Sequence, residues 1–522
     1  MTIAGSKLAS PAFTAEGAGI TEFTILSHKD GKKADIKQGI QGKCYFKYYE
    51  SILQDVVRAT VTFIDTGESV DGKSVKEGLP ITGEEKAVIK IVDNNNQALK
   101  VGLCVNKPQD VYDDTRKKIT GLNFASEEFF RNERVRIISH MEGLVSQSVK
   151  TILTQSGPER PVGGQGGNKS RYSGGVKSES NTIEYLNTEK EIFIEKTSNT
   201  WNFNGNGWKP FWWINRLARE AIPSSENLDD GELGNNAGFM FWETSEGFHF
   251  VSVDGLMNTE TNKPKKRFIY NETPEGACSA NLPTRYDAKV LEFSTDGGVN
   301  VQEKLNMGTF SSHGNYFDPY NTKMENIDVW AGNVDGNVSF ANSKGDQDFL
   351  KLAGKDLAVF SKEKTPSRFY WNVKDTGTNF AGSVEEQIKN SKETNAKLGN
   401  IKGQAISRLN QLFSFQVTIT IPGDFSLHAG DAVYFDAPGL RTNKEAKGND
   451  EIDQFVSGNY VIMSLLHYLD GSFTLTKLTL VRDSFGRKPQ SSTDSSTAEG
   501  FGSVGTQFQD MSGFALPSGH IG

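Results

Sequence analysis

The sequence predicts a mostly β, α+β protein, with an antiparallel β domain towards each end, an α+β region between them and a flexible C-terminal tail. Two observations carry this prediction. Short runs of alternating apolar and polar residues recur along the chain between Gly, Asn and Asp residues, which is typical of antiparallel strands joined by turns. Glycine supplies 53 of the 522 residues and phenylalanine 33, a composition that favours strands and turns over long helices.

The length and the charge limit the classes of protein to consider. A chain of 522 residues suggests about three or four domains. The formal net charge is −8, whereas a dedicated nucleic-acid binder normally carries a basic face. The short basic cluster at 263–267 is interpreted as a solvated loop beside a strand.

The cysteines and the N-terminal residues predict a protein that folds in a reducing cytosol. Cys44, Cys104 and Cys278 are odd in number and widely spaced, so they form neither a disulfide framework nor a metal-binding pair. The first 23 residues lack the basic stretch and apolar run of a secretory signal. No run of about 18 apolar residues predicts a membrane span.

Changes in composition and periodicity divide the chain into five segments. In order, these are a first β domain with a helical end, a Gly/Ser-rich loop or linker, a middle α+β region, a helix followed by a second β domain, and the tail. Their predicted bounds are 1–154, 155–181, 182–382, 383–485 and 486–522. The loop and the tail lack the apolar periodicity from which a packed core is built.

The middle region is predicted to contain a helix and a hairpin. The helix begins at Pro210, because proline is tolerated at the first helical position, and it ends before Pro223. The hairpin has arms at 238–243 and 248–253, joined by a turn at 245–247.

The segment that alternates most strictly lies near the end of the chain. Apolar and polar residues alternate without exception from Phe413 to Ile421, which predicts a strand with one buried face. A hairpin is predicted at 460–481 across Asp470-Gly471. The apolar phase slips near Lys477, which predicts a β-bulge there.

Motifs that carry chemistry are few. Gly163–Ser170 has some likeness to a phosphate-binding loop, but Asn168 breaks the required Gly-Lys-Ser. The seven histidines form no metal-binding pair at helical spacing, and turn chemistry explains His313 near Asp318 equally well. No Gly-x-Ser-x-Gly nucleophile motif occurs. The sequence therefore predicts no catalytic residue, no metal site and no cofactor.

Two alternatives to a structural role stay open. A cell-wall-degrading enzyme needs two carboxylates about 5 to 10 Å apart, and Glu243 and Asp254 are the candidates, with Glu246 in the turn between them. A carbohydrate-binding adhesin would use the aromatic residues of 208–213. Packing in a core or an interface is the favoured interpretation of these aromatic residues.

A series of short motifs, taken in order and spacing, resembles a known family. The motifs are Glu50-Ser51-Ile52-Leu53, Leu79–Glu85, Trp208-Lys209-Pro210-Phe211, Ala237–Thr244, Gly247–Phe250, Ile421-Pro422-Gly423-Asp424, Ala429-Gly430-Asp431, Ser457–Tyr460 and Leu478–Asp483. Together they resemble the baseplate central hub proteins of contractile-tailed, myovirus-type bacteriophages and their secretion-system relatives. The resemblance spans about Glu22 to Asp483.

The resemblance implies two tail-tube-like antiparallel β-barrel domains, around Asp55–Val105 and Phe413–Arg482, in each subunit of a homotrimer. Three copies would match a hexameric tail tube to a trimeric central spike. The implied partners are the tail tube protein, the central spike protein and baseplate wedge or other hub proteins. DNA would pass through the lumen without specific binding, which suits a chain without strong positive charge. The implied location is the phage tail baseplate in the virion, after synthesis in the host bacterial cytoplasm.

We expect the contacts between copies on the exposed face and edges of the 413–421 strand and of the 460–481 hairpin. The reason is that strand edges at a barrel can pair with other strands. The candidate subunit-interface residues are Phe415, Val417, Thr418, Ile419, Thr420, Tyr460, Leu478 and Leu480.

Overall fold

The computed structural model describes much of the chain between residues 19 and 483. The described residues are 19–28, 31–36, 44–65, 67, 70–93, 97–113, 118–154, 156–157, 176–177, 183–224, 237–258, 262–270, 289–296, 300–309, 311–318, 322–330, 366–373, 383–386, 398–437, 453, 456–470 and 473–483. The predictions for the tail, and for all but four residues of the 155–181 loop, lie outside the described residues. Within them the predicted mostly β, α+β class is confirmed.

The first β region is a run of antiparallel strands. They are β1 (Gly19–Leu26), β2 (Lys33–Asp35), β3 (Tyr45–Ser51), β4 (Arg58–Asp65), β5 (Lys86–Val92), β6 (Ala98–Asp113) and β7 (Lys118–Ala125), with the one-turn helix α1 (Val75–Gly78). Their spatial order is β2-β1-β5-β6-β7-β4-β3. In β4 the alternating pattern buries Ala59, Val61 and Phe63, as expected of a strand with one inner face.

The second β region contains strands from two distant parts of the chain. They are β16 (Arg267–Tyr270), β17 (Lys289–Val290), β18 (Glu292–Asp296), β22 (Phe415–Pro422), β23 (Ala432–Asp436), β24 (Gly458–Asp470) and β25 (Phe473–Arg482). Their order is β18-β22-β25-β24-β23-β16-β17. Only Leu291 separates β17 from β18, and its N–H donates to Thr420 O. The short segment 289–296 therefore pairs with β16 at one end of this set and with β22 at the other.

Four consecutive strands have the same arrangement in the two β regions. We name them A to D in chain order: β4, β5, β6 and β7 in the first region, and β22, β23, β24 and β25 in the second. In both regions the spatial order is A-D-C-B, and every pair is antiparallel. In both regions C and D form the long hairpin.

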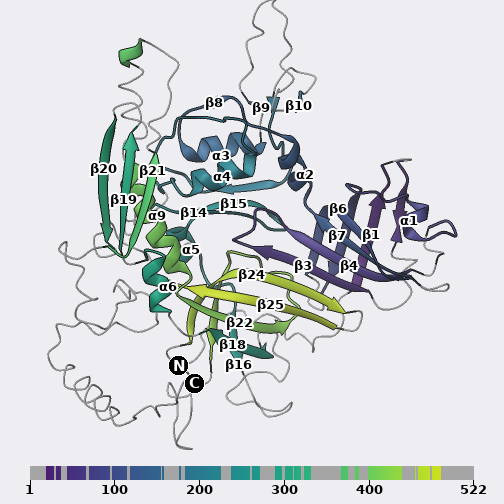
Figure 1. Ribbon diagram of the computed structural model, residues 1–522. Coiled ribbons are helices and arrows are strands. Elements are labelled where there is room, and N and C mark those ends of the chain that lie inside the picture. The colour runs from purple at the N-terminus through teal and green to yellow at the C-terminus, as the bar shows by residue number, and fades with distance from the viewer. Residues whose placement is uncertain are drawn as a thin grey trace, which may run out of the picture.

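The two β regions are joined into one 14-stranded sheet by β3 and β24. These strands pair antiparallel from Ser51↔Ser464 to Tyr45↔Asp470, while the first residues of β24 pair with β23. One hydrophobic core contains residues of both regions, including Phe63 and Ile419. Figure 1 shows the two regions side by side, with the first in purple and the second in yellow and green.

The bulge predicted near Lys477 is wrong in position. The strand β25 pairs with β22 without interruption, whereas β24 carries a register shift between Ile462 and Ser464. The apparent slip in the sequence has another cause. Thr476 points into the interior and hydrogen-bonds His467, so a polar residue occupies an inward position.

The middle region, which here also takes in the helical end of the predicted first segment (127–154), lies against the junction of the two β regions and has its own core. Its helices are α2 (Glu127–Arg134), α3 (Val145–Thr154), α4 (Pro210–Ala218) and α5 (Val253–Met257). Its strands are β8 (His140–Met141), β9 (Ser156–Gly157), β10 (Val176–Lys177), β11 (Ile183–Glu184), β12 (Glu191–Ile194), β13 (Phe203–Asn204), β14 (Phe239–Glu243) and β15 (Gly247–Ser252). The predicted helix start at Pro210 and the β14–β15 hairpin are both confirmed.

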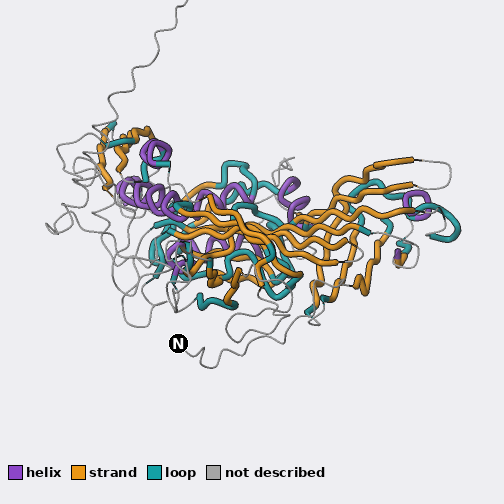
Figure 2. The backbone as a smooth tube through the Cα atoms, turned by 90° about the horizontal axis from the view of Figure 1, so that it is seen from below, coloured by secondary structure: helices purple, strands orange, loops and turns teal. Residues whose placement is uncertain are grey.

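A small outer sheet completes the described fold. It consists of β19 (Ser311–Asp318), β20 (Lys323–Trp330) and β21 (Arg368–Val373) in the order β20-β19-β21, and α6 (Val301–Asn306) precedes it. The helix α9 (Leu398–Leu412) packs against β19 and β20. The helix that the sequence predicts before the second β domain is present, and its residues Ile401, Ala405 and Leu412 are buried. Figure 2 shows the strands running through the centre of the molecule, with this sheet and α9 at one end.

Candidate functional site at the junction of the β regions

Glu50, in β3, is a buried carboxylate on which donors from its own strand and from two distant segments converge. Tyr48 donates its hydroxyl to Glu50 Oε1 over 2.8 Å. The backbone N–H of Ser245, in the β14–β15 turn, and that of Ala429, in the loop before β23, donate over 2.9 and 3.0 Å. A single side chain therefore links the first β region, the middle region and the second β region.

His428 supplies the positive charge at this joint. Its Nδ1 lies 3.3 Å from Glu50 Oε1, and its Nε2 lies 3.6 Å from the exposed Glu246. Burial alone would raise the pKa of Glu50, but the hydrogen bond and charge of His428, with the two backbone donors, hold that pKa below its usual value. Burial would lower the pKa of His428, but Glu50 raises it above its usual value. The geometry thus favours an ion pair in the interior.

A second buried ion cluster surrounds Lys190. Its Nζ lies 2.7 Å from Glu128 Oε2 and also pairs with Glu243, in β14. The other oxygen of Glu243 accepts the N–H of Val57 over 3.0 Å. Burial raises the pKa of Glu243 to about 7, whereas Lys190 and Thr188 hold the pKa of Glu128 below its usual value despite burial.

A third cluster is centred on Arg408, in α9. Its Nε donates to Asp254, in α5, over 2.5 Å, and its Nη1 donates to Asp483 over 2.7 Å. All three side chains are almost completely buried. This arrangement ties the long helix to the end of β25 and to the middle region.

These contacts decide how the two candidate catalytic carboxylates can act. A glycosidase needs both carboxylates at the scissile bond of a bound sugar. Glu243 and Asp254 are instead buried in separate ion clusters, where Lys190 and Arg408 occupy their oxygens. The raised pKa of Glu243 is of the kind that a general acid has, but its carboxyl group has no access to solvent.

The aromatic residues of 208–213 divide into a buried and an exposed group. Trp213 is buried, and its Nε1 donates to Gly205 O over 2.8 Å. Trp208 and Trp212 stack on each other with ring centroids 4.5 Å apart and keep exposed surface. The favoured packing interpretation thus describes Trp213, while Trp208 and Trp212 remain available to a ligand or partner.

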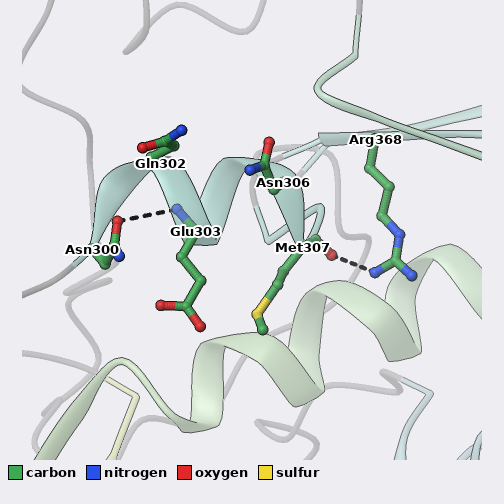
Figure 3. Close-up of a pocket in the computed structure, with 6 residues that line it drawn as sticks. All are labelled: Asn300, Gln302, Glu303, Asn306, Met307 and Arg368. Carbon is green, nitrogen blue, oxygen red and sulfur yellow. Dashed lines mark hydrogen bonds between the residues drawn. The ribbon is translucent and has the colours of Figure 1, made fainter.

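A shallow hollow of about 460 Å³ lies beside the outer sheet. It is lined by Asn300, Gln302, Glu303, Asn306 and Met307, around α6, and by Arg368 of β21. In Figure 3 Gln302 and Asn306 point to the opposite side of α6 from Glu303 and Met307, and Arg368 donates to Met307 O over 2.6 Å. The arrangement orders the loop after α6. No motif in the sequence pointed to this hollow.

The predicted subunit-interface residues divide according to the face of the strand on which they lie. Six are buried in the core of this chain, namely Phe415, Val417, Ile419, Tyr460, Leu478 and Leu480. Thr418 and Thr420 point to the opposite face of β22 and keep some exposure. The strand itself lies between β18 and β25 rather than at an edge. The interface role therefore stays a prediction for the two threonines.

The basic cluster at 263–267 is a largely exposed loop that runs into β16, as predicted, but it also makes ion pairs. Lys265 pairs with Asp431 over 2.8 Å, and Lys266 and Arg267 pair with Asp424 and Asp436. Since these three aspartates belong to the second β region, the cluster fastens β16 and the preceding loop to it. A charge run alone cannot reveal partners more than 150 residues away.

The described residues contain neither a three-residue metal-binding group nor a helix that could span a membrane. Among them, no group of three His, Cys, Asp or Glu side chains is arranged to hold a metal ion. His313 Nδ1 lies 2.6 Å from Asp328 Oδ1 of β20, and its Nε2 lies 3.0 Å from Asn315 Oδ1. No helix in the described part of the chain is long and apolar enough to cross a membrane.

Comparison with known proteins finds similar solved structures but no family. No protein-family model and no curated protein matches the chain. A tail protein from Neisseria meningitidis MC58 is 9% identical, with 90% of this chain and 97% of that chain covered and a TM-score of 0.45. The 43 kDa tail protein of prophage MuSo2 from Shewanella oneidensis is 10% identical, with 88% and 98% covered and a TM-score of 0.43. A type VI secretion system component from Escherichia coli is 9% identical, with 90% and 79% covered and a TM-score of 0.37. These values are too low to assign a function.

Proposed function

We propose that this chain is the structural central hub of a contractile-tail baseplate. In this role a homotrimer acts as a symmetry adaptor that joins a hexameric tail tube to a trimeric central spike and lines the DNA channel. The observation that carries the proposal is the A-D-C-B strand order present in both β regions. A chain with two copies of one unit, repeated around a three-fold axis, presents six similar units.

The side chains that precede strand B support the idea of a repeated unit. Glu85 immediately precedes β5 and accepts the N–H of Thr82, three residues earlier, over 2.7 Å. Asp431 immediately precedes β23 and accepts the N–H of His428, also three residues earlier, over 2.8 Å. The two regions therefore share a turn with an acidic cap as well as a strand order.

The junction of the two regions suits an adaptor that must hold two units at a fixed angle. The β3–β24 pairing and the Glu50 cluster both connect the units directly. A buried ion pair is stable only in one relative orientation, because any shift leaves a charge without its partner. A ring built from such chains would keep its lumen diameter under load.

The outward face of β22 is the proposed contact between copies in the ring. Thr418 and Thr420 lie on that face and could pack against a neighbouring copy. The double substitution Thr418→Lys with Thr420→Lys places two positive charges there without touching the core. We expect it to dissociate the trimer and to leave the far-ultraviolet circular dichroism unchanged.

The first experiment is the mass of the purified full chain by light scattering, alone and with candidate tube and spike proteins. A trimer of the 57.4 kDa chain, or a monomer that becomes trimeric with the spike, would support the proposal. A monomer that binds neither partner would refute it. If both the wild-type chain and the double lysine variant are trimers, the proposed β22 contact is wrong but the hub role stands.

Carbohydrate binding is a second candidate function because of one observation, the exposed Trp208–Trp212 pair. Exposed aromatic faces are suitable for stacking on apolar ligand surfaces. Binding of the chain to a glycan array that is lost on Trp212→Ala would support this function. If the chain binds no glycan on the array, this second function is wrong.

A further inference from the structure

One face of the outer sheet is both apolar and exposed. The parallel register of β19 and β21 places His313, Asn315 and Phe317 beside Phe369, Trp371 and Val373. The antiparallel register of β19 and β20 adds Met324 beside Phe317 and Asp328 beside His313. These residues therefore share one face of the sheet.

The exposure on this face is large for apolar side chains. Phe369, Trp371 and Val373 are 56%, 70% and 63% exposed, and Phe317 and Met324 are also exposed. Single exposed apolar residues are ordinary on protein surfaces, but a contiguous group of large ones marks an interaction surface. We call these five residues the outer patch.

The opposite face of the sheet is already covered. Tyr316 is buried there and shares a hydrogen bond of 2.9 Å with Tyr370, and α9 packs against β19 and β20. Figure 1 shows α9 beside the sheet. The core thus accounts for one face, and the outer patch needs a partner of another kind.

The free edge of β21 adds to this surface. Within the described residues, β21 pairs with β19 alone, so its other edge presents backbone N–H and C=O groups. A free edge beside apolar side chains is suited to docking another chain. Phe369, Trp371 and Val373 all lie on this edge strand.

The charges on this face indicate which partner fits. Among its described residues the ionisable side chains are His313 and Asp328, which pair with each other, so the outer patch itself is neutral. Residues that lie close to a symmetry axis meet their own copies across it, and like charges there would repel. A neutral, apolar patch avoids this repulsion and can therefore meet a second copy of itself.

We propose that the outer patch is a contact between copies of this chain, in which Trp371 of one copy packs against the outer patch of the next. The inference rests on the proposed function, because it requires an assembly of more than one copy. It places a second contact far from the proposed β22 contact, on the end of the molecule that α9 supports.

The substitution Trp371→Asp tests the proposal, because a charge at this exposed position leaves the core intact. We expect the wild-type chain to have the mass of an oligomer and the variant to dissociate, with unchanged circular dichroism and thermal midpoint. Val373→Asp should behave in the same way and serves as the second variant if the first fails to fold. Leu53→Asp is the matched control, since Leu53 is an exposed apolar residue outside the outer sheet and should leave the mass unchanged.

Disulfide trapping identifies the occupant of the patch. In a Cys278→Ser background, Trp371→Cys should form a covalent dimer on mild oxidation, visible on a gel without reductant, while Leu53→Cys should not. An oligomer whose mass survives both aspartate variants, with no covalent dimer, would refute this contact and leave the hub proposal standing. A wild-type monomer that stays monomeric with the spike would refute both. A patch that binds only a different protein would refute this contact alone.

Discussion

The two β regions share a strand order but differ in what fills their interiors. In the first region, strands A and D turn Val61, Phe63, Leu122 and Phe124 inwards, with Thr120 and Asp65 as the polar residues on that face. In the second region, strand A is equally apolar, but strand D turns Thr474, Thr476 and Arg482 inwards. Strand order therefore depends on the alternation of inward and outward residues, and the inward residues need not all be apolar.

Several of the polar groups inside the second region have specific partners. Thr476 Oγ1 lies 2.9 Å from His467 Nδ1 and accepts the N–H of Asp424 over 3.1 Å. The guanidinium of Arg482 lies between the rings of Phe415 and Tyr460, at 4.6 and 4.7 Å from their centroids. Buried polar groups are tolerated only with such partners. We therefore expect the second region to respond to changes in charge as well as to changes in volume.

The largest expected effect is the loss of the charge at Arg408. Arg408→Ala leaves the buried Asp254 and Asp483 without their partner and should lower the free energy of unfolding by about 3–5 kcal/mol. Urea denaturation measures the change. Lys209→Ala is the control, since its pairing with Glu133 is partly exposed and should cost at most about 1 kcal/mol. Equal effects in the two variants would contradict the importance of the buried cluster.

The next effect is at the joint between the two β regions. Glu50→Gln removes the charge that His428 pairs with and should lower the free energy of unfolding by about 1–3 kcal/mol near neutral pH. Chemical denaturation of the variant and of the wild type measures the difference. The conservative control is Glu133→Gln on the surface, which should cost much less.

The same joint predicts a particular dependence on pH. The raised pKa of His428 gives stability that is complete below the unfolded value of about 6.5 and is lost as pH rises through the folded pKa. The lowered pKa of Glu50 gives stability that is present above the unfolded value of about 4.3 and is lost as pH falls through the folded pKa. The pair therefore contributes most between about pH 4.3 and 6.5. A Glu50→Gln variant whose stability follows the wild-type pH profile would contradict this.

The smallest expected effect concerns a feature that the two regions share, a buried isoleucine in their common core. Ile89, in β5, and Ile419, in β22, are both fully buried in the shared core. Ile89→Val and Ile419→Val should each cost about 0.5–1.5 kcal/mol, because each removes one methylene group from a packed site. Thermal unfolding compares them directly. A several-fold difference would mean that the two interiors are packed to different densities.

Much of the local structure could be predicted from the sequence. The alternation from Phe413 to Ile421 gives β22, and Pro210 begins α4, because periodicity and proline act over a few residues. The repeat of the A-D-C-B order escaped prediction, since strand spacing reveals nothing of which strands are neighbours. Burial of the predicted interface residues also escaped it, because an alternating strand looks the same whether it covers its own core or a partner's.

By itself, then, the sequence determined where strands, turns and helices form, along with the mildly acidic charge and the motifs that resemble a tail hub. The tertiary structure alone decided which charges are buried together. Glu50 meets Ala429 from 379 residues away, and Arg408 meets Asp254 and Asp483 from two other segments. The physical reason is range: hydrogen-bond periodicity and backbone preference act between near neighbours, whereas ion pairs and core contacts depend on how the whole chain is folded.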